Sequence, residues 1–202
     1  MPTTTRFGLT WDYRCPFARI VHEHVLLALD LGAGWEVEFL PFSLSQVHVE
    51  EGDVDVWDDP AKARDHLAME AAIAVQKENP ESFPRVHGAL FRARHEEGRD
   101  LRDPQVVKDV LRESGVEPDA VMGAVEEGWP REEFRAAHQR MVASHGVWGV
   151  PTFVVGDRAA FARLMNRPDG DAGRSRESIE RIVAMVGDWP ELNELKHTTL
   201  QN

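Results

Sequence analysis

The strongest constraint on the fold lies near the start of the chain, where strand and helix patterns alternate. Residues 7–11 alternate apolar and polar or small side chains, as in a half-buried strand. Apolar residues then recur at helical spacing over 16–32, and residues 35–42 alternate again. A strand, a helix and a strand in so short a stretch predict a βαβ unit with two parallel strands.

The middle of the chain has helical patterns throughout. We predict helices over 60–79 and 84–97, and further helices that begin at Pro104, Pro118 and Pro130. Proline suits the first turn of a helix because the amide hydrogen that it lacks would be unpaired there. These helices are too many for a simple connection between strands, so the region reads as an inserted helical subdomain.

Strand character returns near the end of the chain. Residues 152–155 are β-branched and aromatic, and Gly156-Asp157 suits a tight turn before a short partner strand. Ser175 is expected to cap a last helix. The order predicts an α/β fold in two parts, namely residues 1–45 plus 146–202, and the helical insertion 46–145.

Charge and composition argue against several classes of protein. The chain has 23 basic and 35 acidic residues, for a net charge of −12, which disfavours nucleic acid and anionic membranes as partners. No apolar run approaches the roughly 18 residues of a membrane-spanning helix, and the first residues lack a signal-peptide core. A single cysteine cannot form an internal disulfide, so we expect a cytoplasmic protein.

The single cysteine, Cys15, stands where the first helix is expected to begin, directly before Pro16. The free N–H groups and the positive dipole of a helix start favour a thiolate at such a position. Arg14 and Arg19 flank it and would act in the same direction. The sequence therefore predicts a lowered Cys15 pKa and a nucleophilic sulfur. A buried, inert cysteine is the alternative reading.

A second motif lies more than a hundred residues later, where Val150-Pro151 precedes a predicted strand. Cys15-Pro16-Phe17-Ala18 after a first strand, a helical insertion, and Gly149-Val150-Pro151-Thr152 before the third strand together resemble the DsbA-like branch of the thioredoxin superfamily. That branch includes kappa-class glutathione transferases and 2-hydroxychromene-2-carboxylate isomerases. The resemblance implies a thioredoxin-like fold with an inserted helical subdomain. It also implies that Pro151 is cis beside the active site, and that the Val150 backbone pairs with a bound peptide or thiol.

The chain departs from these families at two positions. Ala18 replaces the second cysteine of DsbA-type oxidants, and Cys15 replaces the serine of the transferases and isomerases. A cysteine without a resolving partner can still accept one thiol and be released by a second, external thiol. We therefore expect a cytoplasmic monothiol thiol-disulfide oxidoreductase with no tightly bound cofactor, whose co-substrate is a low-molecular-weight thiol such as glutathione or mycothiol.

Two other functions stay open. The protein could be a glutathione- or mycothiol-dependent transferase or isomerase of the kappa-class type, in which Cys15 only positions a bound thiol. It could also be a redox-inactive binding protein that keeps the fold. Protein thiols or disulfides are possible substrates in place of small ones, and the sequence leaves monomer and homodimer open.

The remaining candidates are aromatic residues and histidines. Trp148, in a glycine-flanked loop, is predicted to line a pocket beside the sulfur. His24 falls on the apolar stripe of the first helix and is expected inside, whereas His22, His138 and His145 are expected at the surface. We predict no metal site, because the chain offers no matching ligand spacing. The predicted site comprises Cys15 as nucleophile, Arg14, Pro16, Phe17, Ala18 and Arg19 around it, and Trp148, Val150, Pro151 and Thr152 as the thiol- or substrate-binding group.

Overall fold

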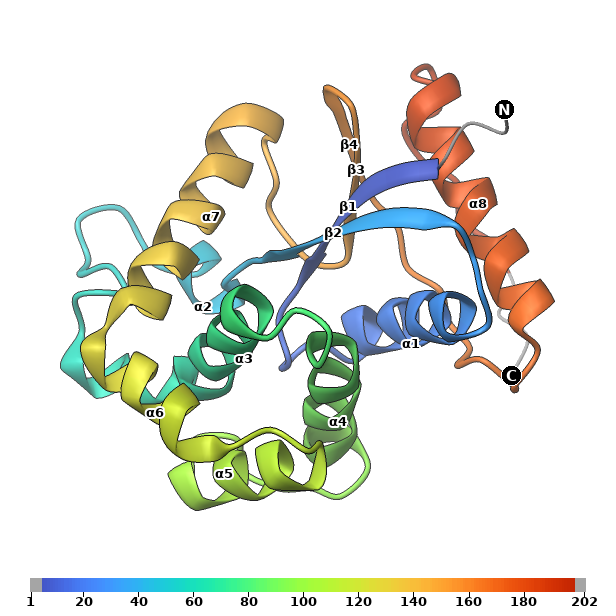
Figure 1. Ribbon diagram of the computed structural model, residues 1–202. Coiled ribbons are helices and arrows are strands. Elements are labelled where there is room, and N and C mark those ends of the chain that lie inside the picture. Colours follow the sequence, from blue (N-terminus) through green and yellow to red (C-terminus); the bar gives the residue numbers. More distant parts are fainter. Residues whose placement is uncertain (1–4, 199–202) are drawn as a thin grey trace.

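A computed structural model describes residues 5–198 and places a four-stranded sheet, with strand order β2-β1-β3-β4, at the centre of the fold (Figure 1). β1 is parallel to β2 and antiparallel to β3, and β4 is antiparallel to β3. The strands are β1 (Thr5–Trp11), β2 (Trp35–Pro41), β3 (Thr152–Val155) and β4 (Arg158–Phe161). The predicted α/β class and the parallel βαβ unit are confirmed.

Two long helices from opposite ends of the chain pack together beside the sheet (Figure 1). They are α1 (Pro16–Asp30) and α8 (Ala172–Asp188). The prediction that Ser175 caps α8 is wrong, because Asp171 accepts the Arg174 N–H and the helix begins four residues earlier than Ser175 would allow. Ser175 lies inside the helix, where its buried hydroxyl bonds His24 Nδ1 at 2.9 Å.

The region between β2 and β3 is helical, as Figure 1 shows, and its buried residues join the sheet and α1 in one hydrophobic core. At its centre is α3, whose residues 67–75 are all buried, in contact with α4, α6 and α7. The helix predicted over 60–79 is divided, because a 3₁₀ turn occupies Pro60–His66 and the α-helix begins only at Leu67. The helices are α2 (Leu44–Val47), α3 (Leu67–Glu78), α4 (Phe83–His95), α5 (Pro104–Glu113), α6 (Pro118–Glu127) and α7 (Trp129–His145).

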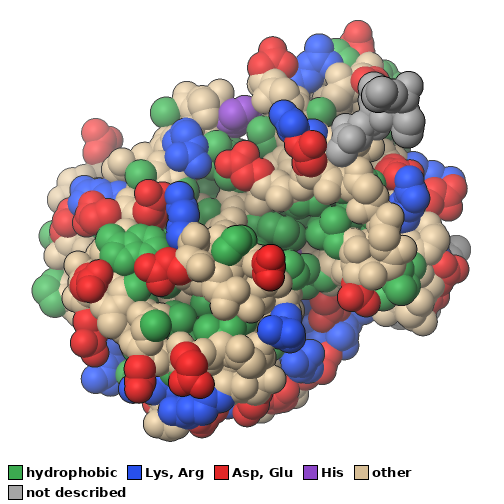
Figure 2. All heavy atoms as spheres, in the orientation of Figure 1, with side chains coloured by type: hydrophobic (Ala, Val, Ile, Leu, Met, Phe, Trp, Pro, Cys, Tyr) green, Lys and Arg blue, Asp and Glu red, His purple; other side chains and the backbone are tan. Residues whose placement is uncertain are grey.

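The surface carries charges of both signs. On the face shown in Figure 2, acidic and basic side chains are interspersed, and hydrophobic side chains reach the surface between them. Many of the charges are paired, as in the (i, i+4) pairs of Arg176 with Glu180 and Arg181 with Glu177 on α8. Within residues 5–198, no helix combines the length and the apolar character needed to cross a membrane.

Candidate functional site

The sulfur of Cys15 lies at the start of α1. Cys15 is the N-cap residue, Pro16 follows in the first turn, and the Ala18 N–H donates to Cys15 Sγ at 3.4 Å. A hydrogen bond from Cys15 N to the Asp12 carbonyl, 3.0 Å long, closes the turn that leads out of β1. Local sequence therefore fixes this position, since an extended cap residue before proline directs its side chain to the free N–H groups.

The loop before β3 meets this sulfur from the other end of the chain. The Val150–Pro151 peptide bond is cis. The Cys15 thiol donates to the Val150 carbonyl at 3.4 Å, across 135 residues of sequence. The Pro151 carbonyl in turn accepts the Ala162 N–H at 3.2 Å, which ties the end of β4 to the same place. Three distant segments thus meet at one thiol.

Thr152 follows the cis proline and has its polar groups paired within the protein. It is buried, its hydroxyl donates to the Gly149 carbonyl at 2.8 Å, and its N–H donates to Thr10 Oγ1 at 2.8 Å. Its polar groups therefore hold the loop onto β1, and the substrate-binding role expected of Thr152 stays a prediction.

The prediction of a lowered Cys15 pKa is wrong. Burial raises the pKa of this thiol, which is 8% exposed, and the negative charge of Asp12 raises it further. The N–H groups of Ala18 and Phe17 and the charge of Arg163 lower the pKa, but they do not outweigh burial. At rest the sulfur is therefore a protonated thiol that donates to Val150.

The two flanking arginines are occupied by carboxylates. Arg14 donates to both oxygens of Asp12, at 3.0 and 2.6 Å, and also contacts Ser45. Arg19 pairs with Glu23 at 2.7 Å and with Glu96, and it is buried. Each positive charge is thereby compensated, so the expected thiolate-stabilising role of Arg14 and Arg19 is also wrong.

The cation that does influence the sulfur is Arg163, just after β4, which sequence reasoning missed. Its guanidinium carbon lies 4.7 Å from the centre of the Phe17 ring and 5.6 Å from that of Phe161. The Phe161 ring packs on Trp148 at 4.8 Å, and Trp148 is 63% exposed. No sequence signal marks Arg163, because it lies outside both motifs and only the fold brings it to Phe17.

A buried chain of hydrogen bonds runs behind the sulfur. Tyr13 Oη lies 2.9 Å from His87 Nδ1, His87 Nε2 lies 2.9 Å from His22 Nδ1, and His22 Nε2 lies 3.2 Å from the Thr10 carbonyl. Because a carbonyl can only accept, His22 donates to Thr10, His87 donates to His22 and the Tyr13 hydroxyl donates to His87.

Burial keeps every member of this chain neutral. It lowers the pKa of His22 to about 3 and that of His87 well below its ordinary value, and it raises the pKa of Tyr13 well above 10.0. The expectation that His22 lies at the surface is wrong, because α4 covers this side of α1 and His22 is fully buried. This series of hydrogen bonds joins the turn before Cys15 to α4 of the helical subdomain.

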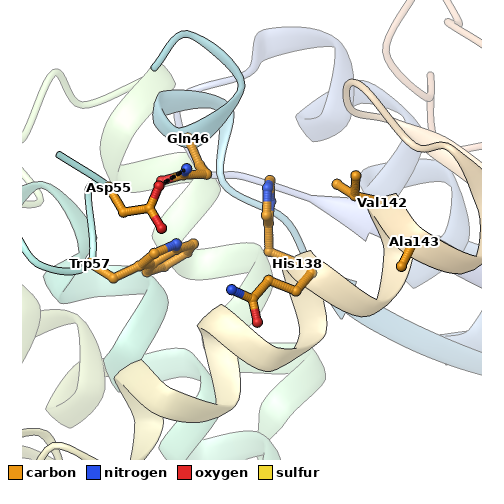
Figure 3. Close-up of a pocket in the computed structure, with 7 residues that line it drawn as sticks. Gln46, Asp55, Trp57, His138, Val142 and Ala143 are labelled. Atoms are coloured by element: carbon orange, nitrogen blue, oxygen red, sulfur yellow. Dashed lines mark hydrogen bonds between the residues drawn. The ribbon is translucent and has the colours of Figure 1, made fainter. Parts of the chain in front are cut away.

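Two pockets lie near these elements, and Cys15 lines neither. One, of about 260 Å³, borders the turn before the sulfur at Asp12, Tyr13 and Arg14. The other, of about 200 Å³, lies between α2 and α7 and is drawn in Figure 3. His138 lines it, buried against Trp57, and its Nδ1 accepts the Ser43 N–H at 3.3 Å. The expectation that His138 lies at the surface is therefore wrong.

Side chains that commonly bind metals do not cluster in the described part of the chain. Within residues 5–198, His, Cys, Asp and Glu side chains form no group of three or more that could hold a metal ion. The carboxylates of Asp12 and Glu23, beside the sulfur in sequence, are instead paired with Arg14 and Arg19.

The raised pKa of Cys15 predicts slow alkylation. At neutral pH, iodoacetamide should modify native Cys15 more slowly than a free cysteine, because only the thiolate reacts. The rate should still be rising above pH 8.5, the ordinary cysteine pKa, since burial favours the protonated form. The measurement is the alkylation rate against pH, followed by intact mass, with the chain unfolded in urea as the control. A rate that levels off below pH 8 in the native protein would contradict the prediction.

Comparison with known proteins places the chain in a family. A model of the DsbA-like thioredoxin domain matches residues 10–167, so the chain belongs to the DsbA-like thioredoxin domain family. It is also 25% identical over 195 residues to the uncharacterized protein Rv2286c from Mycobacterium tuberculosis, a match that covers 95% of this chain and 81% of that protein.

Solved structures with the same fold include an isomerase and a reductase. The chain is similar to a 2-hydroxychromene-2-carboxylate isomerase, with 16% identity and a TM-score of 0.61 over 90% of this chain and 97% of that one. It is also similar to the cytosolic disulfide reductase DsbM from Pseudomonas aeruginosa, whose structure contains GSH, with 16% identity and a TM-score of 0.59 over 88% and 98% of the two chains. The predicted thioredoxin-like fold with a helical insertion is thus confirmed.

Proposed function

We propose that the protein is a monothiol thiol-disulfide oxidoreductase that exchanges one small thiol through Cys15. The observation that carries the proposal is the position of the sulfur, 3.4 Å from both the Ala18 N–H and the Val150 carbonyl. The sulfur lies where a helix start meets the loop before β3, so a thiolate formed there has the first-turn N–H group of Ala18 to stabilise its charge. The likeness to a cytosolic disulfide reductase solved with GSH supports the same chemistry.

The reaction balances with one protein sulfur. The Cys15 thiolate attacks a mixed disulfide X–S–S–R, the S–S bond breaks, and X–S⁻ leaves while Cys15–S–S–R forms. A second small thiolate R–S⁻ then attacks the sulfur of the bound R–S group. This step forms R–S–S–R and returns Cys15 as thiolate. Ala18 cannot perform this second attack, so the releasing thiol comes from solution.

The surroundings of the sulfur set the pH at which this reaction runs. The first-turn N–H groups and Arg163 favour the thiolate, while burial and Asp12 favour the thiol, with burial the largest effect. The resting thiol must therefore lose the proton that it shares with Val150 before it attacks. Because the release step consumes free small thiol, we propose the reducing cytoplasm as the place of action.

The test is a mass measurement on the whole protein. After incubation with glutathione disulfide at pH 8, the protein should gain the mass of one glutathione, and dithiothreitol should remove it. The adduct can form only at Cys15, because the chain has one cysteine. If Cys15 gains no adduct while N-acetylcysteine does under the same conditions, the proposal is overturned.

A second candidate function follows from the protonated state of the sulfur. A thiol that donates to Val150 could instead donate to the sulfur of a bound small thiol, which is the role of a positioning group in a transferase or isomerase. The likeness to 2-hydroxychromene-2-carboxylate isomerase favours this candidate. It predicts that a hydroxyl at position 15 supports turnover. A redox-inactive binding protein would show neither an adduct nor turnover.

A further inference from the structure

The surface beside the sulfur contains a guanidinium that is held in place by aromatic rings. Arg163 lies over Phe17, two residues after Cys15, and over Phe161, the last residue of β4. Phe161 is itself backed by the exposed ring of Trp148. Contact with two rings limits the rotamers of the long arginine side chain, so the charge is held near one place.

This guanidinium has no acidic partner in the described part of the chain. Within residues 5–198, no ion pair or hydrogen bond joins the Arg163 side chain to another residue, whereas the nearby Arg167 pairs with Glu23 and Glu96. The contrast is notable in a chain with 35 acidic residues against 23 basic ones. The hydrogen-bond donors of Arg163 are thus free for a ligand.

Backbone contacts bring the segment that contains Arg163 close to the reacting sulfur. Ala162, its neighbour, donates to the Pro151 carbonyl at 3.2 Å, and Val150 accepts the Cys15 thiol at 3.4 Å. The charge of Arg163 is felt at the sulfur, where it lowers the Cys15 pKa. A small thiol that is bonded to Cys15 would therefore have its other groups close to the Arg163 guanidinium.

We infer that Arg163 binds a carboxylate of the thiol co-substrate, which makes small anionic thiols and their disulfides the preferred substrate class. This inference rests on the proposed function and deepens it. Arginine suits the role because its planar fork can bind both oxygens of a carboxylate, and because stacking on aromatic rings does not use its N–H groups. Glutathione carries two carboxylates and mycothiol carries none, so the inference favours glutathione-like thiols over mycothiol.

The test compares a charged and a neutral disulfide. The rate of adduct formation at Cys15 is measured by intact mass with glutathione disulfide and with bis(2-hydroxyethyl) disulfide, and the ratio of the two rates is taken. This ratio cancels any change in Cys15 ionisation, which affects both reagents. Arg163→Gln should lower the ratio about tenfold, the size expected for one charge-assisted contact. Arg181→Gln, an exposed arginine on α8, is the control with the same charge change and should leave the ratio unaltered.

The outcomes separate this inference from the proposed function. If both disulfides react and Arg163→Gln leaves the ratio unchanged, the inference is overturned while the proposed function stands. If neither disulfide reacts with the natural protein, the proposed function fails, and binding of S-methylglutathione by calorimetry decides the inference alone. About tenfold weaker binding by Arg163→Gln than by Arg181→Gln would then support the carboxylate site, and equal binding by the two variants would exclude it.

Discussion

Cys15→Ser is expected to abolish thiol exchange, with a loss on the order of a thousandfold or more in the rate of transfer from a glutathionylated peptide to free glutathione. A serine hydroxyl stays protonated at neutral pH, and its oxygen cannot form the Cys15–S–S–R intermediate. The measurement is release of the peptide thiol over time. The effect should be close to complete because the chain has no second cysteine to take over.

The variant is also informative because it should fold. Serine is among the preferred N-cap residues, and its oxygen can accept the Ala18 N–H that Cys15 Sγ accepts now. The free energy of unfolding of Cys15→Ser should therefore stay close to that of the natural protein. Lost exchange in a stable variant can then be assigned to chemistry.

Cys15→Ala separates the two candidate functions. If Cys15→Ser keeps substantial turnover with a small thiol as co-substrate, exchange through the sulfur is excluded and the positioning role is favoured. In that case Cys15→Ala should lose turnover, because it has no group to donate to the bound thiol. If both variants are inactive, the sulfur itself is required, as the proposed function states.

The parts of the fold that sequence predicted are those set by local signals. The first strand, helix and second strand follow from the side-chain period, and α1, α5 and α6 begin at the expected prolines 16, 104 and 118. Asp103 caps α5 by accepting the Gln105 N–H at 2.8 Å, as its place before Pro104 suggests. Each of these signals acts within a few residues, so no knowledge of tertiary packing is needed.

The predictions that failed at the site depend on ion pairing and burial, which spacing along the chain does not reveal. Arg19 is one turn along α1 from Cys15, but its charge is held by Glu23 on the same helix and by Glu96, which is 77 residues away and follows α4 directly. The thiol is buried by a loop 135 residues later in the chain. Sequence shows which charges are adjacent to a cysteine, and it does not show which of them are already paired.

The histidines show that tertiary packing also limits which buried residues can be predicted from sequence. The apolar stripe of α1 correctly predicted a buried His24, which packs toward α8 and bonds Ser175. His22 lies on another side of α1 and faces the sheet, where it bonds the Thr10 carbonyl of β1 at 3.2 Å and packs on Phe39 of β2. Here α4 of the insertion covers that side and supplies His87 as a partner. A helix with two buried sides has no single stripe to reveal both.

The second large effect is expected in acid, where the protein should lose stability steeply below pH 6.5. Burial lowers the pKa of His22 to about 3, of His66 and His138 to about 4, and of His87 well below its ordinary value. These groups stay neutral in the folded protein at pH 5, whereas the unfolded chain takes up protons below about pH 6.5. Their contribution to stability is therefore fully present above pH 6.5 and is lost as the pH falls toward 4.

The magnitude follows from proton linkage. Each histidine costs roughly 1.4 kcal/mol per pH unit in this window, so four together remove about 5.5 kcal/mol per unit. Glu70 offsets about one histidine's share of this loss at the acid end. Burial raises the pKa of the Glu70 carboxyl, so the folded state takes up its proton more readily than the unfolded state. With a typical stability of about 5–15 kcal/mol, this loss places acid unfolding between roughly pH 5.5 and pH 4.

The measurement is the free energy of unfolding in urea at several pH values between 7.5 and 5. His138→Phe should reduce the slope by about a quarter, since it removes one proton-binding site of the unfolded chain. An aromatic ring there keeps the contacts with Phe42 and Trp57, which His138 makes at centroid distances of 4.3 and 5.8 Å. His48→Gln, at an exposed position, is the matched control and should leave the slope unchanged. A stability that stays constant down to pH 4.5 would mean that these histidines titrate in the folded protein, and the neutral chain from Tyr13 to Thr10 would then be wrong.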